Sequence, residues 1–329
     1  PLPNGGRLAY TLNGIRAFGI SVGLFLFLHF TEIVSGSFIY RNIKSILGSA
    51  NILVYLLTIV VFFIGRRQQT SPEARCSLLD QYFVGAAKNP RILGTFDLKF
   101  FCESRPGLTL WVLVCLSSLI YQWEKYRTVH NSLILSTYFV CLYIVDYYIV
   151  EDAILTTWDI IHEPFGWMLC WGSLIYVPFF YPLYALYLAD NPYTLPWWAA
   201  VAIFLWGNAG YIIFRQSNLQ KHWFRKGTVG KIWGKDPEYI ETKRGTKLLI
   251  SGWWGVASHA NYLGDLMLSS AMSLASGFNS PFCYTYIFSF IILLLHRDWR
   301  DDRHCARKYG LDWLRYREKV PYHIIPYVY

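Results

Sequence analysis

Long apolar runs, separated by shorter polar segments, extend along this chain from about residue 15 to residue 296. A helix needs about 20 largely apolar residues to cross the hydrocarbon core of a membrane, and most of these runs approach or reach that length. The pattern therefore predicts an all-α, polytopic helical membrane protein with about eight spans. We expect these spans at residues 15–39, 48–65, 107–123, 132–150, 167–189, 196–214, 262–278 and 281–296.

The distribution of charge gives the predicted spans an orientation. With an even number of spans, the N-terminus, the loops 66–106, 151–166 and 215–247 and the C-terminal tail lie on one side, and they carry nearly all of the 30 Lys and Arg residues. Basic loops remain on the cytoplasmic side of a membrane, so we assign this side to the cytoplasm. The net charge of +9 resides mainly in residues 215–247 and in the tail.

Composition narrows the class of protein. A chain of 329 residues with 54% hydrophobic and 19% aromatic residues is too apolar for an ordinary soluble domain. We expect one integral membrane domain over 1–329, with N-terminal spans and a polar motif loop in 1–130 and a catalytic and cofactor-binding half in 131–329. The seven cysteines form no C-x-x-C pair and are interpreted as reduced.

The sequence lacks the motifs that are typical of several classes of protein. The chain has neither the G-x-G-x-x-G fingerprint of a Rossmann fold nor a G-x-x-x-x-G-K-[ST] phosphate loop. Its eight histidines are scattered without the clustered spacings of membrane di-iron enzymes, so we expect no metal. The basic segments are too few and too close to the membrane to indicate nucleic acid as a partner.

Two basic segments indicate a polyanionic ligand. If residues 215–226 continue the preceding helix, Lys221 and Arg225 share one of its faces and are suited to a diphosphate. The alternative is an ordinary basic cytoplasmic loop. Arg297, Asp301 and Lys308 likewise repeat at helical spacing, and guanidinium groups bind phosphate with two hydrogen bonds. A solvated, salt-bridged helix end is the alternative there.

The polar aromatic run from Gly252 to Asp265 precedes the seventh span. Trp254, Asn261 and Asp265 are spaced seven and four residues apart, which predicts one helical face with a ring for stacking and polar groups for hydrogen bonding. The alternative is a packed helix crossing in which the glycines permit close approach and His259 is satisfied in the core.

A third candidate lies in the fourth span. Asp146 falls near its cytoplasmic end, Tyr143 and Tyr147 share its face, and Glu151 follows just beyond. A carboxylate within a membrane is costly, and this makes Asp146 a functional candidate. Contact with interfacial water or a structural cap is the alternative.

From about residue 75 to its end the chain resembles the sterol reductases, a family that includes C14 sterol reductase, 7-dehydrocholesterol reductase, the fungal C24(28) reductase and the sterol-reductase domain of the lamin B receptor. The tail and the Phe96–Phe101 segment are more similar to the C14 branch than to the C7 branch. The matching motifs are Leu78–Gly85, Asn89–Arg91, Phe96–Lys99, Ser104–Gly107, Trp206–Arg215, Trp233–Lys235, Leu249–Asp265, Lys308–Gly310, Val320–Tyr322 and Ile325–Tyr329.

This resemblance implies NADPH-dependent reduction of a sterol ring double bond, with C14=C15 as the first choice. It also implies a fold of about ten spans with a cytoplasm-facing cofactor pocket in the C-terminal helices. Protonation of the alkene would precede hydride transfer. Tyr143 is the first candidate for the acid, with Asp301 orienting or relaying, and Asp146 and Glu151 are second choices. The cofactor residues that the resemblance implies are Lys221, Arg225, Leu248, Trp254, Asn261, Arg297, Asp301 and Tyr309.

The same resemblance implies a sterol that enters from the bilayer, contact with membrane lipid and no obligate protein partner. The compartment would be the endoplasmic reticulum or nuclear envelope in a eukaryote and the cytoplasmic membrane in a bacterium. Three alternatives stay open: a C7 reductase, a membrane methyltransferase of the isoprenylcysteine type, and a non-catalytic protein similar to the lamin receptor. The methyltransferase motif is matched imperfectly, because Ala260 replaces its proline.

Overall fold

The computed structural model describes residues 8–68, 77–228 and 230–329, and the chain divides into two compact units, Pro1–Thr194 and Leu195–Tyr329. Helices dominate both units, as the apolar runs predict, and the described part of each unit adds one small antiparallel hairpin. Whether the two units make one membrane domain with the expected internal division near residue 130 stays a prediction.

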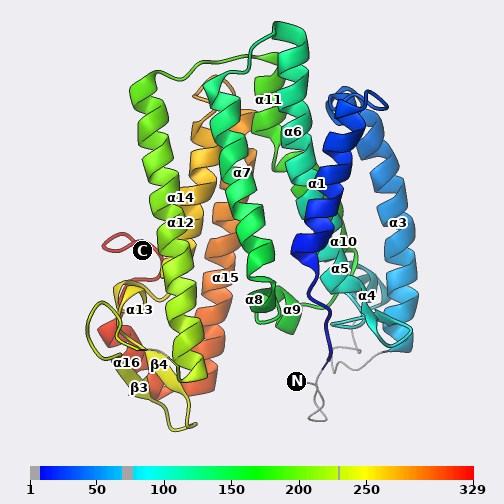
Figure 1. Ribbon diagram of the computed structural model, residues 1–329. Helices are drawn as coiled ribbons and strands as arrows, with labels where there is room; N and C mark the ends of the chain where they lie inside the picture. The colour runs from blue at the N-terminus through cyan, green and yellow to red at the C-terminus, as the bar shows by residue number, and fades with distance from the viewer. Residues whose placement is uncertain (1–7, 69–76, 229) are drawn as a thin grey trace. The chain divides into compact units, whose positions relative to one another are not determined.

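The first unit is built around long apolar helices that run side by side (Figure 1). The turn segments between them, which the sequence predicted only as polar loops, contain the short helices and the β1–β2 hairpin. Its elements are α1 (Gly14–Phe30), α2 (Phe38–Arg41), α3 (Ile43–Arg67), α4 (Leu78–Phe83), β1 (Arg91–Ile92), β2 (Phe96–Asp97), α5 (Leu98–Ser104), α6 (Pro106–Tyr126), α7 (Asn131–Ile149), α8 (Glu151–Ile154), α9 (Trp158–His162), α10 (Trp167–Trp171), η2 (Gly172–Phe180) and α11 (Leu183–Asp190).

The second unit has three main helices, α12, α14 and α15, beside one another (Figure 1). The β3–β4 hairpin, which pairs Tyr239 with Leu249 and Glu241 with Lys247, lies with α16 at one end of these helices. Its elements are α12 (Trp197–Lys226), β3 (Tyr239–Glu241), β4 (Lys247–Leu249), α13 (Trp253–Val256), α14 (Ala260–Leu274), η3 (Pro281–Tyr284), α15 (Thr285–Tyr309) and α16 (Leu311–Lys319).

Most residues of every predicted span are helical. Within the described ranges, five helical stretches are long and apolar enough to cross a membrane: Ile43–Arg67, Leu98–Tyr126, Asn131–Ile149, Trp167–Asp190 and Trp197–Lys226. The apolar α1 is shorter. Most of the predicted span 262–278 lies in α14, which ends at Leu274, and most of 281–296 lies in α15, which begins at Thr285. The exact number of spans therefore stays a prediction. The first predicted span, residues 15–39, extends past the end of α1, because the chain turns after Phe30.

The stretch from Trp167 to Asp190 is helical but not uniform. It begins as α10, widens into the π-helical turns of η2 and resumes as α11. Pro178 lies inside η2, and a proline there has no N–H to donate and crowds the preceding turn, which accounts for the widened helix.

Close packing of α12 against α14 is the main contact of the second unit. Gly264 and Gly210 face each other at the crossing, and a side chain at either position would collide with the backbone of the opposite helix. Small residues permit such close approach between apolar helices. The alternative interpretation of residues 252–265, a helix crossing in which glycines permit close approach, is thus confirmed for Gly264.

One buried cation organises the connection after α7. Lys99 on α5 is fully buried, and its Nζ donates to the carbonyl oxygens of Asp159, Ile160 and Glu163 at 2.5–3.0 Å. These carbonyls lie at the C-terminal end of α9, where helical carbonyls lack partners within their own helix. The ammonium group therefore caps α9 and fixes the segment that follows α7.

Candidate functional site

The basic end of α12 is one continuous helix. It runs without interruption to Lys226 and ends at Gly227, whose φ of 71° lies in the left-handed region. Residues 215–226 thus continue the preceding helix, as the interpretation of Lys221 and Arg225 required. The two residues lie one turn apart, and each charge acts on the other.

Lys221 is in contact with Trp254. Its Nζ lies over the indole ring, 3.9 Å from the ring centroid, a cation–π contact. The buried Trp254 also donates from Nε1 to the carbonyl oxygen of Ser217 at 2.8 Å. These contacts hold α13 against α12, so the structure brings together two of the residues that the sequence analysis placed at the cofactor site.

The prediction of one helical face from Trp254 to Asp265 is wrong. Helix α13 ends at Val256, Ala257 is extended with φ −152° and ψ 150°, and α14 begins only at Ala260. The break has a tertiary cause, because the N–H groups of Ser258 and His259 donate to the carbonyl oxygens of Tyr322 and His323 in the tail. Only Asn261 and Asp265 share a helix.

Asn261 and Asp265 retain unused acceptors. The Nδ2 of Asn261 donates to Oδ1 of Asn218 at a long 3.5 Å. The Oδ1 atoms of Asn261 and Asp265 are both buried, with no hydrogen-bond partner in the described part of the chain. Buried acceptors are normally paired, so this one-turn spacing on α14 suits a ligand or a water that donates. Arg297 on α15 is the charge that acts on Asp265.

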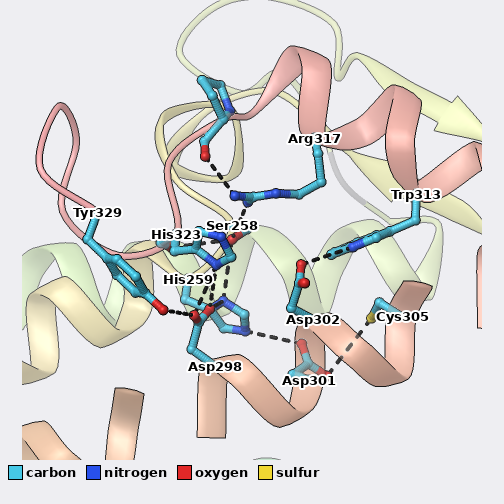
Figure 2. Close-up of polar contacts among 11 residues, drawn as sticks. Ser258, His259, Asp298, Asp301, Asp302, Cys305, Trp313, Arg317, His323 and Tyr329 are labelled. Atoms are coloured by element: carbon cyan, nitrogen blue, oxygen red, sulfur yellow. Dashed lines mark hydrogen bonds and ion pairs between the residues drawn. The ribbon is translucent and has the colours of Figure 1, made fainter. Parts of the chain in front are cut away.

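A compact polar network joins α14, α15 and the tail (Figure 2). His259 Nδ1 lies 2.8 Å from Oδ1 of Asp298, and its Nε2 lies 3.1 Å from Oδ2 of Asp301. We call Asp298, His259 and Asp301 the His259 bridge. From the tail, His323 Nδ1 lies 2.9 Å from Oδ2 of Asp298, and the Tyr329 hydroxyl donates to the same oxygen at 3.0 Å.

Burial and hydrogen bonding have opposite effects on the pKa values of the three residues of this bridge. Burial opposes the cation of His259, but its hydrogen bonds with Asp298 and Asp301 outweigh that effect and raise the pKa of the ring. Burial would likewise raise the pKa of both carboxyl groups, but contact with His259 outweighs it and lowers the pKa of Asp298 and of Asp301. All three shifts favour the ionised forms of these groups.

The remaining predicted cofactor residues lie along α15 and on the hairpin. Arg297, Asp301 and Tyr309 all belong to α15, as the helical spacing predicted. Lys221 and His304 both act on the charge of Asp301. Leu248 on β4 and Tyr309 pack in one apolar cluster with Trp313 of α16.

The candidate catalytic residues other than Asp301 belong to the first unit. Tyr143 is half-buried on α7, and its ring centroid lies 6.2 Å from that of Trp111. Asp146, on the same helix, is buried. Glu151 forms an ion pair with Arg105 and accepts the N–H of Gly14 at 2.7 Å, so it ties α8 to α1 and α6. That arrangement argues against Glu151 as a proton donor.

Sequence reasoning did not identify Asp298, His323 or Tyr329 as members of a site. Asp298 and Asp301 are three residues apart, which signals a shared helical face, but their partner His259 is about 40 residues away in the chain. His259 itself was named only in the packed-crossing alternative. No group of three or more His, Cys, Asp or Glu in the described ranges is arranged to hold a metal ion.

Residues 1–329 match the ergosterol biosynthesis ERG4/ERG24 family. A delta(14)-sterol reductase of Methylotuvimicrobium alcaliphilum is 45% identical over 330 residues, which cover 100% of this chain and 77% of that protein. The delta(14)-sterol reductase LBR of Gallus gallus is 40% identical over 98% of this chain and 51% of its own length. A 7-dehydrocholesterol reductase of Xenopus laevis is 40% identical over 96% of this chain and 70% of its own length.

Proposed function

This chain belongs to the ergosterol biosynthesis ERG4/ERG24 family, and on that premise we propose that it is a sterol reductase, an oxidoreductase that saturates a carbon–carbon double bond of a sterol. The observation that carries the proposal is the match along the whole chain, which includes both the basic end of α12 and the polar network of α15. The resemblance seen in the sequence motifs is thereby confirmed at the level of the family.

We propose C14=C15 as the bond that is reduced, with C7 as the alternative. Support for C14 comes from relatives named delta(14)-sterol reductase, at 45% and 40% identity over the whole chain or nearly so. A 7-dehydrocholesterol reductase at 40% keeps the C7 alternative in the test below. The family match favours reduction over the methyltransferase alternative.

We propose NADPH as the reductant, and the second unit offers residues that fit it. Lys221 and Arg225 present two cations one turn apart for phosphate groups, and Asn261 offers a buried, unpaired acceptor for an N–H or O–H group. Trp254, Arg297, Asp301, Leu248 and Tyr309 would complete the pocket. Bound NADPH supplies the hydride.

The proton must come from a separate group. An isolated alkene accepts hydride only after protonation, and adding the proton at C15 leaves the more stable tertiary cation at C14. Asp301 is ionised through its contact with His259, so in this reaction it accepts and orients hydrogen bonds instead of donating the proton. We retain Tyr143 as the proposed acid and Asp146 as the second choice.

The protein is an integral membrane protein, with five stretches in the described residues able to cross a bilayer. We propose that the basic ends of α12 and α15 face the cytoplasm and that the sterol enters from the bilayer. The concentration of Lys and Arg in residues 215–247 and in the tail supports this orientation.

The test is direct. Purified protein in detergent is incubated with NADPH and one sterol at a time, unsaturated at C14, C7 or C24. The products are identified by mass spectrometry. We expect saturation of the C14=C15 bond. Reduction of the C7 substrate alone would move the protein to the C7 branch, and the absence of any reduced sterol would contradict the proposed function.

We expect NADPH to bind about ten-fold to a hundred-fold more tightly than NADH, because the additional phosphate gains a charge-assisted contact worth about 1.5–3 kcal/mol. Isothermal calorimetry measures both affinities. Arg225→Gln should narrow the difference, whereas Lys231→Gln, which changes an exposed base in the following loop, should not. Equal affinities for the two nucleotides in the unmodified protein would rule out the phosphate assignment.

A further inference from the structure

Both ring nitrogens of His259 are engaged by carboxylates. Asp298 lies 2.8 Å from Nδ1 and Asp301 lies 3.1 Å from Nε2, and the ring is almost fully buried. An ionised carboxylate only accepts hydrogen bonds, so each nitrogen must carry a hydrogen to make a favourable contact. The geometry therefore selects the doubly protonated imidazolium, a fixed cation between two anions.

We propose that His259 is a positioning residue for Asp301: its imidazolium keeps the Asp301 carboxylate ionised and oriented, and the C-terminal segment Tyr322–Tyr329 locks this cation in place. The inference rests on the proposed function, in which Asp301 lies at the cofactor site. It adds a residue, a charge state and a segment of chain to that site.

His259 makes a directional hydrogen bond to Asp301. Its distance is 3.1 Å, whereas the Cys305 Sγ lies 4.0 Å from the other oxygen, and a thiol is a weak donor. Lys221 and His304 also act on the charge of Asp301. Only a directional bond fixes which way the carboxylate oxygens point, and that is the task of a positioning residue.

The tail holds the other end of the bridge. His323 and Tyr329 contact the fully buried Asp298 at 2.9 and 3.0 Å, and Asp298 in turn holds Nδ1 of His259. The backbone is fixed as well, because the N–H of His259 donates to the carbonyl oxygen of His323 at 2.8 Å. The ring is thus anchored through its side chain and its main chain by the same segment (Figure 2).

Charged and titratable groups reach this bridge from every element packed around it. On α14 the ring of Tyr262 stacks against His259 at 4.7 Å between centroids. From α16 the guanidinium of Arg317 donates to Ser258 Oγ at 3.3 Å, one residue from His259. These groups include Lys221 on α12, Tyr262 on α14, Asp298, Asp301, His304 and Cys305 on α15, Arg317 on α16, and His323 and Tyr329 in the tail.

The pH dependence of the reduction rate follows from the directions in which the pKa values of His259 and Asp301 are shifted. The pKa of His259 is raised, so its charge is present at low pH and is lost as pH rises through the elevated value. The pKa of Asp301 is lowered, so its charge is present at high pH and is lost as pH falls through the depressed value. The bridge is complete only between these two limits, and the rate of sterol reduction should be highest there.

The decisive variant is His259→Gln, which keeps a neutral hydrogen-bond donor and removes the cation. Burial then dominates at Asp301 and raises its pKa, so the acidic limb of kcat/KM moves to higher pH by about one unit or more. At a fixed pH on the acidic limb we expect at least about a ten-fold loss, which shrinks as the pH is raised toward neutrality. The control is His296→Gln, which changes an exposed histidine on α15, the helix that carries Asp301. It should leave the pH profile of kcat/KM unchanged.

A uniform loss at every pH would mean that His259 only packs, and an unchanged profile would exclude any role. If His259→Gln does not fold, His323→Gln, which removes one anchor of Asp298, should shift the same limb in the same direction by a smaller amount. No shift in that variant would overturn the role of the tail.

A readout independent of catalysis separates this inference from the proposed function. Infrared difference spectra follow the protonation of carboxyl groups, and Asp301→Asn identifies the band of Asp301. We expect that band to titrate below its ordinary range in the unmodified protein and higher in His259→Gln. If no sterol is reduced but the band behaves in this way, the proposed function fails and the bridge stands. A band that does not move contradicts the bridge.

Discussion

Replacing Tyr143 by Phe should lower the turnover of sterol reduction by about 10²–10⁴, the range typical for loss of a general acid. The change removes one hydroxyl and little volume from a half-buried ring beside Trp111, so the packing of α7 should survive. Binding of NADPH and of sterol should change by less than about three-fold, since the hydroxyl is needed only when the alkene is protonated. Single-turnover kinetics, with separate binding measurements, give both quantities.

Two further variants make this test specific. Tyr138→Phe removes a hydroxyl from an exposed tyrosine on the same helix and should leave turnover unchanged. If Tyr143→Phe retains turnover while Asp146→Asn loses it with both ligands still bound, the acid is Asp146. Glu151 is the weakest of the three candidates, because its carboxylate is already engaged by Arg105 and by the N–H of Gly14.

Lys99→Met should destabilise the first unit by about 2–4 kcal/mol. The methionine keeps the length of the buried stem but removes the ammonium, which leaves the carbonyl oxygens of Asp159, Ile160 and Glu163 without their donor. Buried acceptors that lose their partner cost their full desolvation energy. We expect a lower midpoint of thermal unfolding in detergent, followed by intrinsic fluorescence.

Lys44→Met is the matched control, because Lys44 is exposed on α3. It should leave the unfolding midpoint almost unchanged. If Lys99→Met were as stable as the unmodified protein, the cap on α9 would not be required, and the position of the segment after α7 would have to depend on its other contacts.

The helices were predictable because their signal is local. Apolar runs of membrane length coincide with α3, α6, α7 and α12 to within a few residues at their first turns. The continuation of α12 to Lys226 fulfils the condition under which Lys221 and Arg225 share one face. Helix formation within a bilayer satisfies the backbone inside each segment, so hydropathy alone carries this information.

The break before Ala260 could not be predicted in the same way. The spacing of Trp254 and Asn261 is compatible with one helix, and the interruption depends on backbone hydrogen bonds to Tyr322 and His323, some 64 residues later in the chain. The His259 bridge has the same origin, because its three members come from two helices that only the fold brings together. Long-range pairing of this kind leaves no periodic trace in a single sequence.

The length of α12 has a consequence for the depth at which its charges lie. At 1.5 Å per residue its 30 residues extend about 45 Å, whereas the hydrocarbon core of a bilayer is about 30 Å thick. Exposed Trp197 and Trp198 at its first turn suit the headgroup level of one leaflet. The last ten or so residues then project beyond the hydrocarbon, so Lys221 and Arg225 stand in the headgroup region, within reach of water-soluble anions.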